Sequence, residues 1–127
     1  MSDTSWWASV IFFKQHEFDS PDIVGSGALM DREAVMLFDA IRAAVGKPLH
    51  VNSGYRTKAY NALVRKAKPD SAHTRGMAAD LEALTSSLRF KIVRVALALG
   101  AKRIGVAETY VHIDADKTLP QNVLWLY

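Results

Sequence analysis

Residues 71–80 read SAHTRGMAAD, a polar segment that passes through a glycine into an apolar run. His73 and Asp80 can meet at one metal ion if the histidine leaves a loop and the aspartate lies on the strand that follows. Gly76 stands between them, where the chain needs a turn. The segment therefore predicts a loop-to-strand unit that presents an imidazole and a carboxylate to the same point.

Both residues also have an explanation that involves no metal. A single loop histidine is more often a surface or hydrogen-bonded residue than a ligand. Asp80 has apolar neighbours, among which a carboxylate is costly to bury without a partner, and a salt bridge to Arg75 or Arg56 would supply that partner. The segment alone leaves these alternatives open.

The second segment with chemical potential is Tyr-Val-His-Ile-Asp at 110–114. Alternate residues of a strand point to the same side, so His112 and Asp114 share one face while Val111 and Ile113 face the core. This predicts an imidazole with a carboxylate beside it. A hydrogen-bonded histidine–aspartate pair without metal fits the tripeptide equally well.

Together the two segments supply two imidazoles and one carboxylate. Three such ligands form a catalytic type of zinc site, in which the fourth position is left for water. The chain has no cysteine, so thiolate ligands and cysteine nucleophiles are excluded. We therefore expect one zinc ion per chain.

A third segment, Ser-Gly-Tyr-Arg-Thr at 53–57, follows a predicted strand. An arginine placed after a tight turn can form paired hydrogen bonds to a carboxylate or to a polarised carbonyl. Arg56 is therefore a candidate substrate-binding residue. The alternative is a solvated basic side chain in a loop.

Hydrophobic periodicity predicts the elements around these segments. Helices are expected at about 34–45, 58–66 and 87–99, the first capped by Asp31 and closed by Gly46. Strands are expected at 49–53, 77–84, 103–107, 110–114 and 123–127. This order predicts an α+β fold in which about three helices flank a small, largely antiparallel sheet that carries the zinc site. With 127 residues and no linker-like stretch, residues 1–127 are expected to form a single domain.

Composition narrows the range of partners. The formal net charge is +3, and no aromatic interleaving or nucleic-acid motif accompanies the basic residues, so we expect no nucleic-acid partner. The apolar stretch at 6–13 follows Asp3 and lacks the basic start and cleavage site of a signal peptide. No apolar run approaches the roughly 20 residues of a membrane span. We expect a monomer that is made in the cytoplasm and has no membrane partner.

The motifs occur in one order: Ser-Gly-Tyr-Arg at 53–56, Ser-x-His-x-x-Gly-x-Ala-x-Asp at 71–80, and His-x-Asp at 112–114. This order resembles the D-alanyl-D-alanine carboxypeptidase family of zinc peptidases, of hedgehog-type fold, which includes vancomycin-resistance D,D-dipeptidases and many phage endolysins. The likeness runs from about residue 13 to the terminal Trp-Leu-Tyr, and its most specific part is the segment 71–80. It implies His73, Asp80 and His112 as zinc ligands, Arg56 as a group that binds or polarises substrate, and Ser71 as a substrate contact.

One position departs from the family pattern. Several branches carry an acidic general base three residues before the last ligand, where this chain has Thr109. The catalytic base must then be Asp114 or Glu108. We favour Asp114, which belongs to the His-x-Asp motif, while Glu108 has the longer reach and would share its face if the strand began there.

The resemblance implies a zinc-dependent peptidase that cuts D-amino-acid-containing bonds in the stem or cross-link peptides of bacterial peptidoglycan. A phage-type enzyme would reach the wall through a partner pore. The alternative is a non-catalytic cell-wall-binding or virion module that retains the fold, and Thr109 is its best support.

Overall fold

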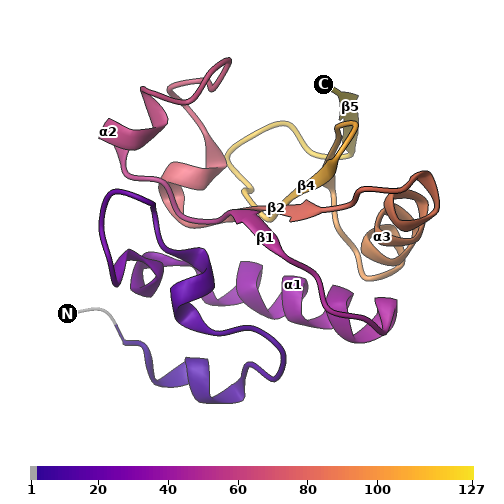
Figure 1. Ribbon diagram of the computed structural model, residues 1–127, viewed down its shortest axis with the longest axis horizontal. Helices are drawn as coiled ribbons and strands as arrows, with labels where there is room; N and C mark the ends of the chain where they lie inside the picture. The colour runs from indigo at the N-terminus through magenta and orange to yellow at the C-terminus, as the bar shows by residue number, and fades with distance from the viewer. Residues whose placement is uncertain (1–2) are drawn as a thin grey trace.

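The computed structural model, which describes residues 3–127, is built around a five-stranded sheet (Figure 1). The strands are β1 Val51–Ser53, β2 Ala78–Glu82, β3 Arg103–Val106, β4 Tyr110–Asp114 and β5 Val123–Leu126. Their order across the sheet is β1-β2-β4-β3-β5. Every neighbouring pair is antiparallel except β3 and β5, which run parallel. The predicted α+β fold with a largely antiparallel sheet is therefore confirmed.

Three α-helices accompany the sheet in the described part of the chain: α1 Arg32–Val45, α2 Lys58–Asn61 and α3 Ser86–Ala98. Four short 3-10 helices precede or separate them: η1 Ser5–Ser9, η2 Gln15–Phe18, η3 Ser26–Leu29 and η4 Ala72–Arg75. Asp31 caps α1 as expected, since its Oδ2 accepts a hydrogen bond from Ala34 N at 3.0 Å. None of the helices within 3–127 is long and apolar enough to span a membrane.

The second helix is shorter than predicted, because the helix expected at 58–66 ends at Asn61. Its apolar residue Leu63 is 82% exposed and has no surface to pack against, so the continuing helical pattern gains nothing from burial. The Asn61 side chain instead donates a hydrogen bond to the Lys68 carbonyl at 2.9 Å. The chain therefore turns back after one helical turn and returns toward the sheet.

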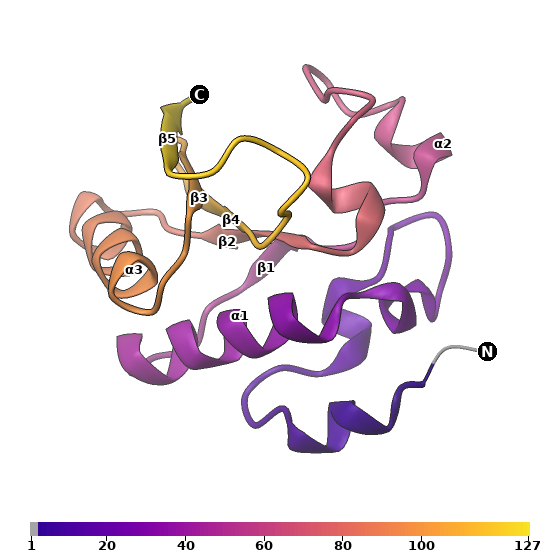
Figure 2. The same ribbon diagram turned by 180° about the vertical axis from the view of Figure 1, so that it is seen from behind.

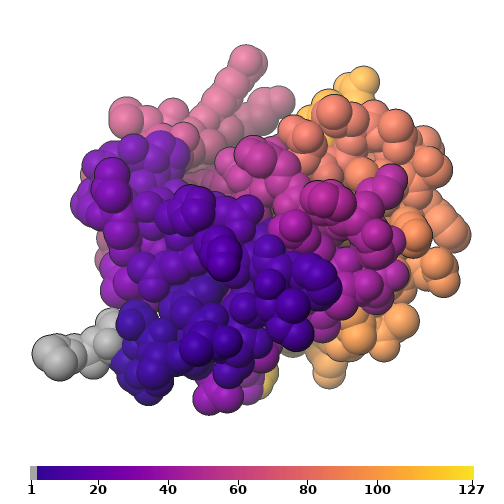
Figure 3. All heavy atoms as spheres, turned by 60° about the horizontal axis from the view of Figure 1, so that its bottom comes forward, coloured from indigo at the N-terminus to yellow at the C-terminus, as the bar shows by residue number. Residues whose placement is uncertain are grey.

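One face of the sheet is covered by α1 and α3, as the two opposite views show (Figures 1 and 2). The core there is formed by alternate strand residues and by the apolar sides of the two helices: Ala34, Val35, Phe38, Ile41, Ala79, Leu81, Ile92, Ala96, Ile104, Val111 and Ile113. The N-terminal segment packs on the outer side of α1, where the rings of Phe18 and Phe38 stack at 6.1 Å. Figure 3 shows this segment, in indigo, as a continuous layer over that side of the molecule.

The opposite face of the sheet carries the polar residues. A single row crosses all five strands in register, through the pairs Ser53 with Asp80, Asp80 with His112, His112 with Gly105, and Gly105 with Trp125. Side chains in one such row are direct neighbours on the face. Two of the three predicted zinc ligands therefore lie side by side on the two central strands.

Candidate metal centre

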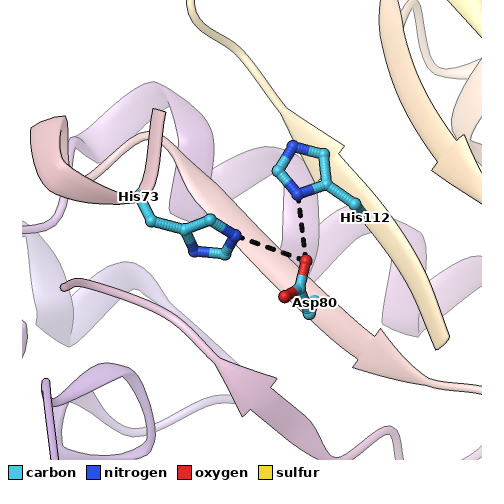
Figure 4. A group of neighbouring side chains, drawn as sticks. All are labelled: His73, Asp80 and His112. Atoms are coloured by element: carbon cyan, nitrogen blue, oxygen red, sulfur yellow. Dashed lines mark hydrogen bonds and ion pairs between the residues drawn. The ribbon is translucent and has the colours of Figure 1, made fainter. Parts of the chain in front are cut away.

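Three buried side chains converge above the middle of the sheet (Figure 4). His73 comes from η4, Asp80 from β2 and His112 from β4. Asp80 Oδ1 lies 3.3 Å from His73 Nε2 and 2.9 Å from His112 Nδ1. One ligand atom from each residue lies within 4.8 Å of the other two, so a single ion can contact all three.

The ring of His73 is oriented by the backbone of the β1–α2 connection. Its Nδ1–H donates to the Gly54 carbonyl at 2.8 Å, which turns Nε2 toward Asp80. Ser71 caps η4, since its Oγ accepts a hydrogen bond from the backbone N–H of His73 at 3.2 Å. The loop histidine therefore has a fixed direction before any ligand binds.

Gly76 ends η4 in the left-handed conformation, with φ +71°. A Cβ at this position would also collide with the Leu29 carbonyl oxygen. The Gly76 carbonyl accepts a hydrogen bond from Asp31 N at 2.7 Å. The turn between His73 and Asp80 is thus pinned against the start of α1.

His112 is oriented from its opposite edge. Its Nε2–H donates to Asp114 Oδ2 at 2.7 Å, which leaves Nδ1 facing Asp80. Asp114 is 2% exposed, and its Oδ1 also accepts hydrogen bonds from Arg103 Nε at 2.8 Å and Asp116 N at 3.1 Å. Asp114 therefore lies behind the imidazole, on the side away from the convergence point.

The protonation of the three ligands reflects their burial and their mutual contacts. Burial lowers the pKa of His73, and the attraction of Asp80 only partly opposes this. Burial also acts to lower the pKa of His112, but hydrogen bonds to Asp114 and Asp80 outweigh it and raise that pKa. Burial would raise the pKa of Asp80, yet the neighbouring His73 and His112 more than offset this and lower it. The site therefore keeps a carboxylate charge under both rings.

These residues fit a zinc ion. Two imidazole nitrogens and one carboxylate oxygen form a three-ligand set of the catalytic type, with a position left over. The nitrogen of each ring that faces away from the cluster is already bonded to an oxygen acceptor, as is usual for metal-binding histidines. The structure therefore brings together the three residues that the sequence motifs indicated.

Arg56 lies at the edge of the cluster and is 9% exposed, so it is not a solvated loop residue. Its Nη2 is 3.4 Å from Asp80 Oδ2, its Nε donates to Ser53 Oγ at 3.0 Å, and its Nη1 donates to Asn61 Oδ1 at 3.2 Å. The salt bridge suggested for Asp80 is thus present, but with the second carboxylate oxygen. Oδ1 stays directed at the two histidines.

The remaining candidates lie further out. Ser71 is half-buried at the start of η4. Glu108 lies in the exposed turn between β3 and β4, because β4 begins at Tyr110 as predicted, so Glu108 does not share a strand face with His112. The Glu108 carbonyl accepts a hydrogen bond from the Arg89 guanidinium, which ties the turn to α3. Thr109 lies in the same exposed turn.

Two residues near the site were not predicted to take part in it. Arg103 binds Asp114, and the Trp125 ring lies 5.3 Å from the His112 ring. Both residues lie outside the three sequence motifs, so the motifs do not point to them. The strand alternation that places Arg103 and Gly105 on one face was the only available signal.

The fold and the site together present three residues that could hold one metal ion, in a donor set of the catalytic zinc type. The family model described as Peptidase M15 matches residues 13–114, and the chain belongs to this family. M15 peptidases are zinc-dependent, which supports a zinc metallopeptidase. No curated protein matches the chain. The matched region ends at Asp114, so β5 lies beyond it.

Proposed function

We propose that this protein is a zinc-dependent peptidase that hydrolyses D-amino-acid-containing peptide bonds in the stem or cross-link peptides of bacterial peptidoglycan. The observation that carries the proposal is the convergence of His73 Nε2, Asp80 Oδ1 and His112 Nδ1 on the face of the sheet opposite α1 and α3. Membership of the M15 family supports the peptidase chemistry. The wall substrate is inferred from the sequence resemblance.

The three ligand residues would hold the zinc ion. Zinc bound there would act as a Lewis acid on the scissile carbonyl and would lower the pKa of a water molecule to make it a nucleophile. Asp80 supplies the negative charge of the site, and the hydrogen bonds behind both rings keep the imidazoles in the tautomers that leave Nε2 and Nδ1 free. These residues therefore provide binding and orientation.

Arg56 would bind substrate from the β1 side. Its guanidinium is already held by Ser53 and Asn61, so it needs little ordering when a carboxylate or carbonyl arrives. Its contact with Asp80 Oδ2 puts its positive charge next to the metal ligands. A substrate with a free terminal carboxylate would gain a paired hydrogen bond there.

The two carboxylates considered as general base would have separate tasks. Both oxygens of Asp114 accept hydrogen bonds, and its Oδ2 lies against the nitrogen of His112 that faces away from the cluster. We therefore assign Asp114 the task of orienting His112. Glu108 is the exposed carboxylate of the two, and we assign it the proton transfer.

The alternative is a non-catalytic module that binds zinc and cell wall without cutting it. The observation that favours it is the exposed turn at 108–109, which carries Thr109 where an acid is expected. Purified sacculi distinguish the two. A peptidase releases fragments whose termini identify the bond in mass spectrometry, and the release stops with a chelator or with His73→Ala. A module binds the sacculi and releases nothing.

A further inference from the structure

The row of paired residues that crosses the sheet ends in a tryptophan. His112 on β4 pairs with Gly105 on β3, which in turn pairs with Trp125 on β5. Gly105 has no side chain, so the space above it on this face is available to a neighbouring side chain. The indole fills it: a Cβ on Gly105 would lie 2.5 Å from Trp125 Nε1. Trp125 therefore leans across β3 toward the metal ligand.

The indole of Trp125 has two neighbours, the His112 ring and the Arg103 guanidinium. Its ring centroid lies 5.3 Å from that of His112, at an interplanar angle of 53°. The Arg103 guanidinium carbon lies over the same indole at 4.9 Å from the centroid. A planar guanidinium stacked on an indole is attracted to it and loses rotational freedom.

Arg103 connects this stack to the ligand by a second route. Its Nε donates to Asp114 Oδ1 at 2.8 Å, and its Nη1 donates to the Pro120 carbonyl at 2.6 Å. Asp114 in turn accepts the Nε2–H of His112 at 2.7 Å through its other oxygen. The guanidinium is thus fixed by a ring, a carboxylate and a carbonyl, and the carboxylate it holds orients the imidazole.

We propose that Arg103 and Trp125 are positioning residues for the zinc ligand His112, so that β5, which lies outside the matched family region, forms part of the metal centre. Arg103 holds the acceptor that keeps Nδ1 directed at Asp80, and Trp125 packs against both Arg103 and the His112 ring. Neither residue is one of the three residues that could hold the metal. The inference rests on the proposed function in one respect only, which is that His112 is a ligand of the zinc ion.

Zinc affinity of the purified protein tests the inference, measured by competition with a chromogenic chelator. Arg103→Met and Trp125→Ala should each weaken zinc binding by about 10-fold or more, the size expected for partners behind a metal ligand. Leu126→Ala is the matched control, because Leu126 is the next residue of β5 and is 78% exposed. It should bind zinc within about 2-fold of the wild type, since surface substitutions away from such contacts have small effects.

Two further readouts separate positioning from general stability. The absorption spectrum of the cobalt(II)-substituted protein reports the ligand geometry, and it should change in Arg103→Met and Trp125→Ala but not in Leu126→Ala. The double variant should lose less affinity than the product of the two single losses, because Trp125 acts partly through Arg103. If Trp125→Ala does not fold, Arg103→Lys decides, since it keeps the charge and loses the planar stack.

The inference is overturned if Arg103→Met binds zinc as tightly as the wild type and gives an unchanged cobalt spectrum. Where Trp125→Ala does not fold, the same result for Arg103→Lys overturns it. Peptidase activity is not among these readouts. A wild-type protein that binds zinc but leaves peptidoglycan intact would instead overturn the proposed function alone.

Discussion

Gly105 lies directly beneath the indole of Trp125, so close that a methyl group on Gly105 would approach Trp125 Nε1 to 2.5 Å and the Tyr127 ring to 2.8 Å. The absence of a side chain at Gly105 is what allows a residue of the edge strand to reach His112 on the second strand away.

Gly105→Ala should therefore push Trp125 off the sheet. We expect a loss of about 1–3 kcal/mol in the free energy of unfolding, as for other overpacked sites, measured by urea denaturation of the metal-free protein. The same substitution in a Trp125→Ala background should cost less, because the closest contact is gone and only the approach to the Tyr127 ring is left. Equal costs in both backgrounds would contradict the packing described here.

Asp114→Asn and Glu108→Gln should fail in different ways. An amide at Asp114 is a poorer partner for Arg103 and His112, so zinc affinity should fall by about 10- to 100-fold. Glu108→Gln should keep its zinc and lose turnover by roughly 100-fold or more, as expected for a lost general base. Zinc titration and a peptidoglycan-release assay on both variants check this. A zinc-replete but inactive Asp114→Asn would return the role of base to Asp114.

Arg56→Lys should reduce activity although the charge is kept. Lysine cannot reproduce the fork that contacts Ser53, Asn61 and Asp80 together. We expect turnover to fall by at least about 10-fold, the equivalent of one charged hydrogen bond of roughly 1.5–3 kcal/mol. Arg65→Lys is the control, because Arg65 is exposed. Wild-type kinetics for both variants would show that the buried guanidinium has no part in binding substrate.

Acid should destabilise the protein in part through Asp116, which is 0% exposed. Burial would raise the pKa of this carboxyl, but hydrogen bonds from Thr118 and the guanidinium of Arg75 outweigh it and lower the pKa. A pKa that is lower in the folded than in the unfolded chain contributes stability above the unfolded value, and this stability is lost as the pH falls.

The measurement is the free energy of unfolding of the wild type and of Asp116→Asn between pH 7 and pH 3. At neutral pH the variant should be less stable by about 2 kcal/mol, since it loses charge-assisted hydrogen bonds. The difference should shrink below about pH 4, the ordinary range of an aspartate. A difference that does not depend on pH would mean that the Asp116 charge contributes nothing.

Native mass spectrometry should find one zinc ion per chain, and Asp80→Ala should reduce this to none at micromolar zinc. Zinc should also raise the unfolding free energy by about 2.7 kcal/mol when its free concentration is 100 times the dissociation constant. His50→Ala is the control, because His50 is exposed and its ring lies beside Asn52. Loss of zinc from this control would contradict the assignment of the ligands.

Local patterns were sufficient to predict most of the fold. The strand at 110–114 was predicted to the residue, because apolar and polar side chains alternate through it. The long helices matched within a few residues at each end. The helix predicted at 58–66 was too long, because the Leu63 side chain is exposed and packs against nothing in the folded protein. Local periodicity carries no information about what a helix will meet.

The site divides in the same way. His73, Asp80 and His112 were predicted as one group because spacing and motif are local properties, and the structure brings them together. Arg103 and Trp125 were not, because their nearness to His112 depends on the register of β4 with β3 and of β3 with β5. The order of the elements along the chain does not determine that β5 pairs with β3, or that the two strands run parallel. The contacts of Arg103 and Trp125 around His112 are therefore visible only in three dimensions.

The turn at Gly76 has a consequence for anyone who maps this protein by saturation mutagenesis. Its left-handed backbone and its contact with the Leu29 carbonyl exclude every other side chain, and its carbonyl is bonded to Asp31. In a library sorted by activity, this position would tolerate no replacement and would score like a zinc ligand. Its intolerance would report the fit between a loop and a helix start, and a protein engineer who read it as chemistry would misplace the active site.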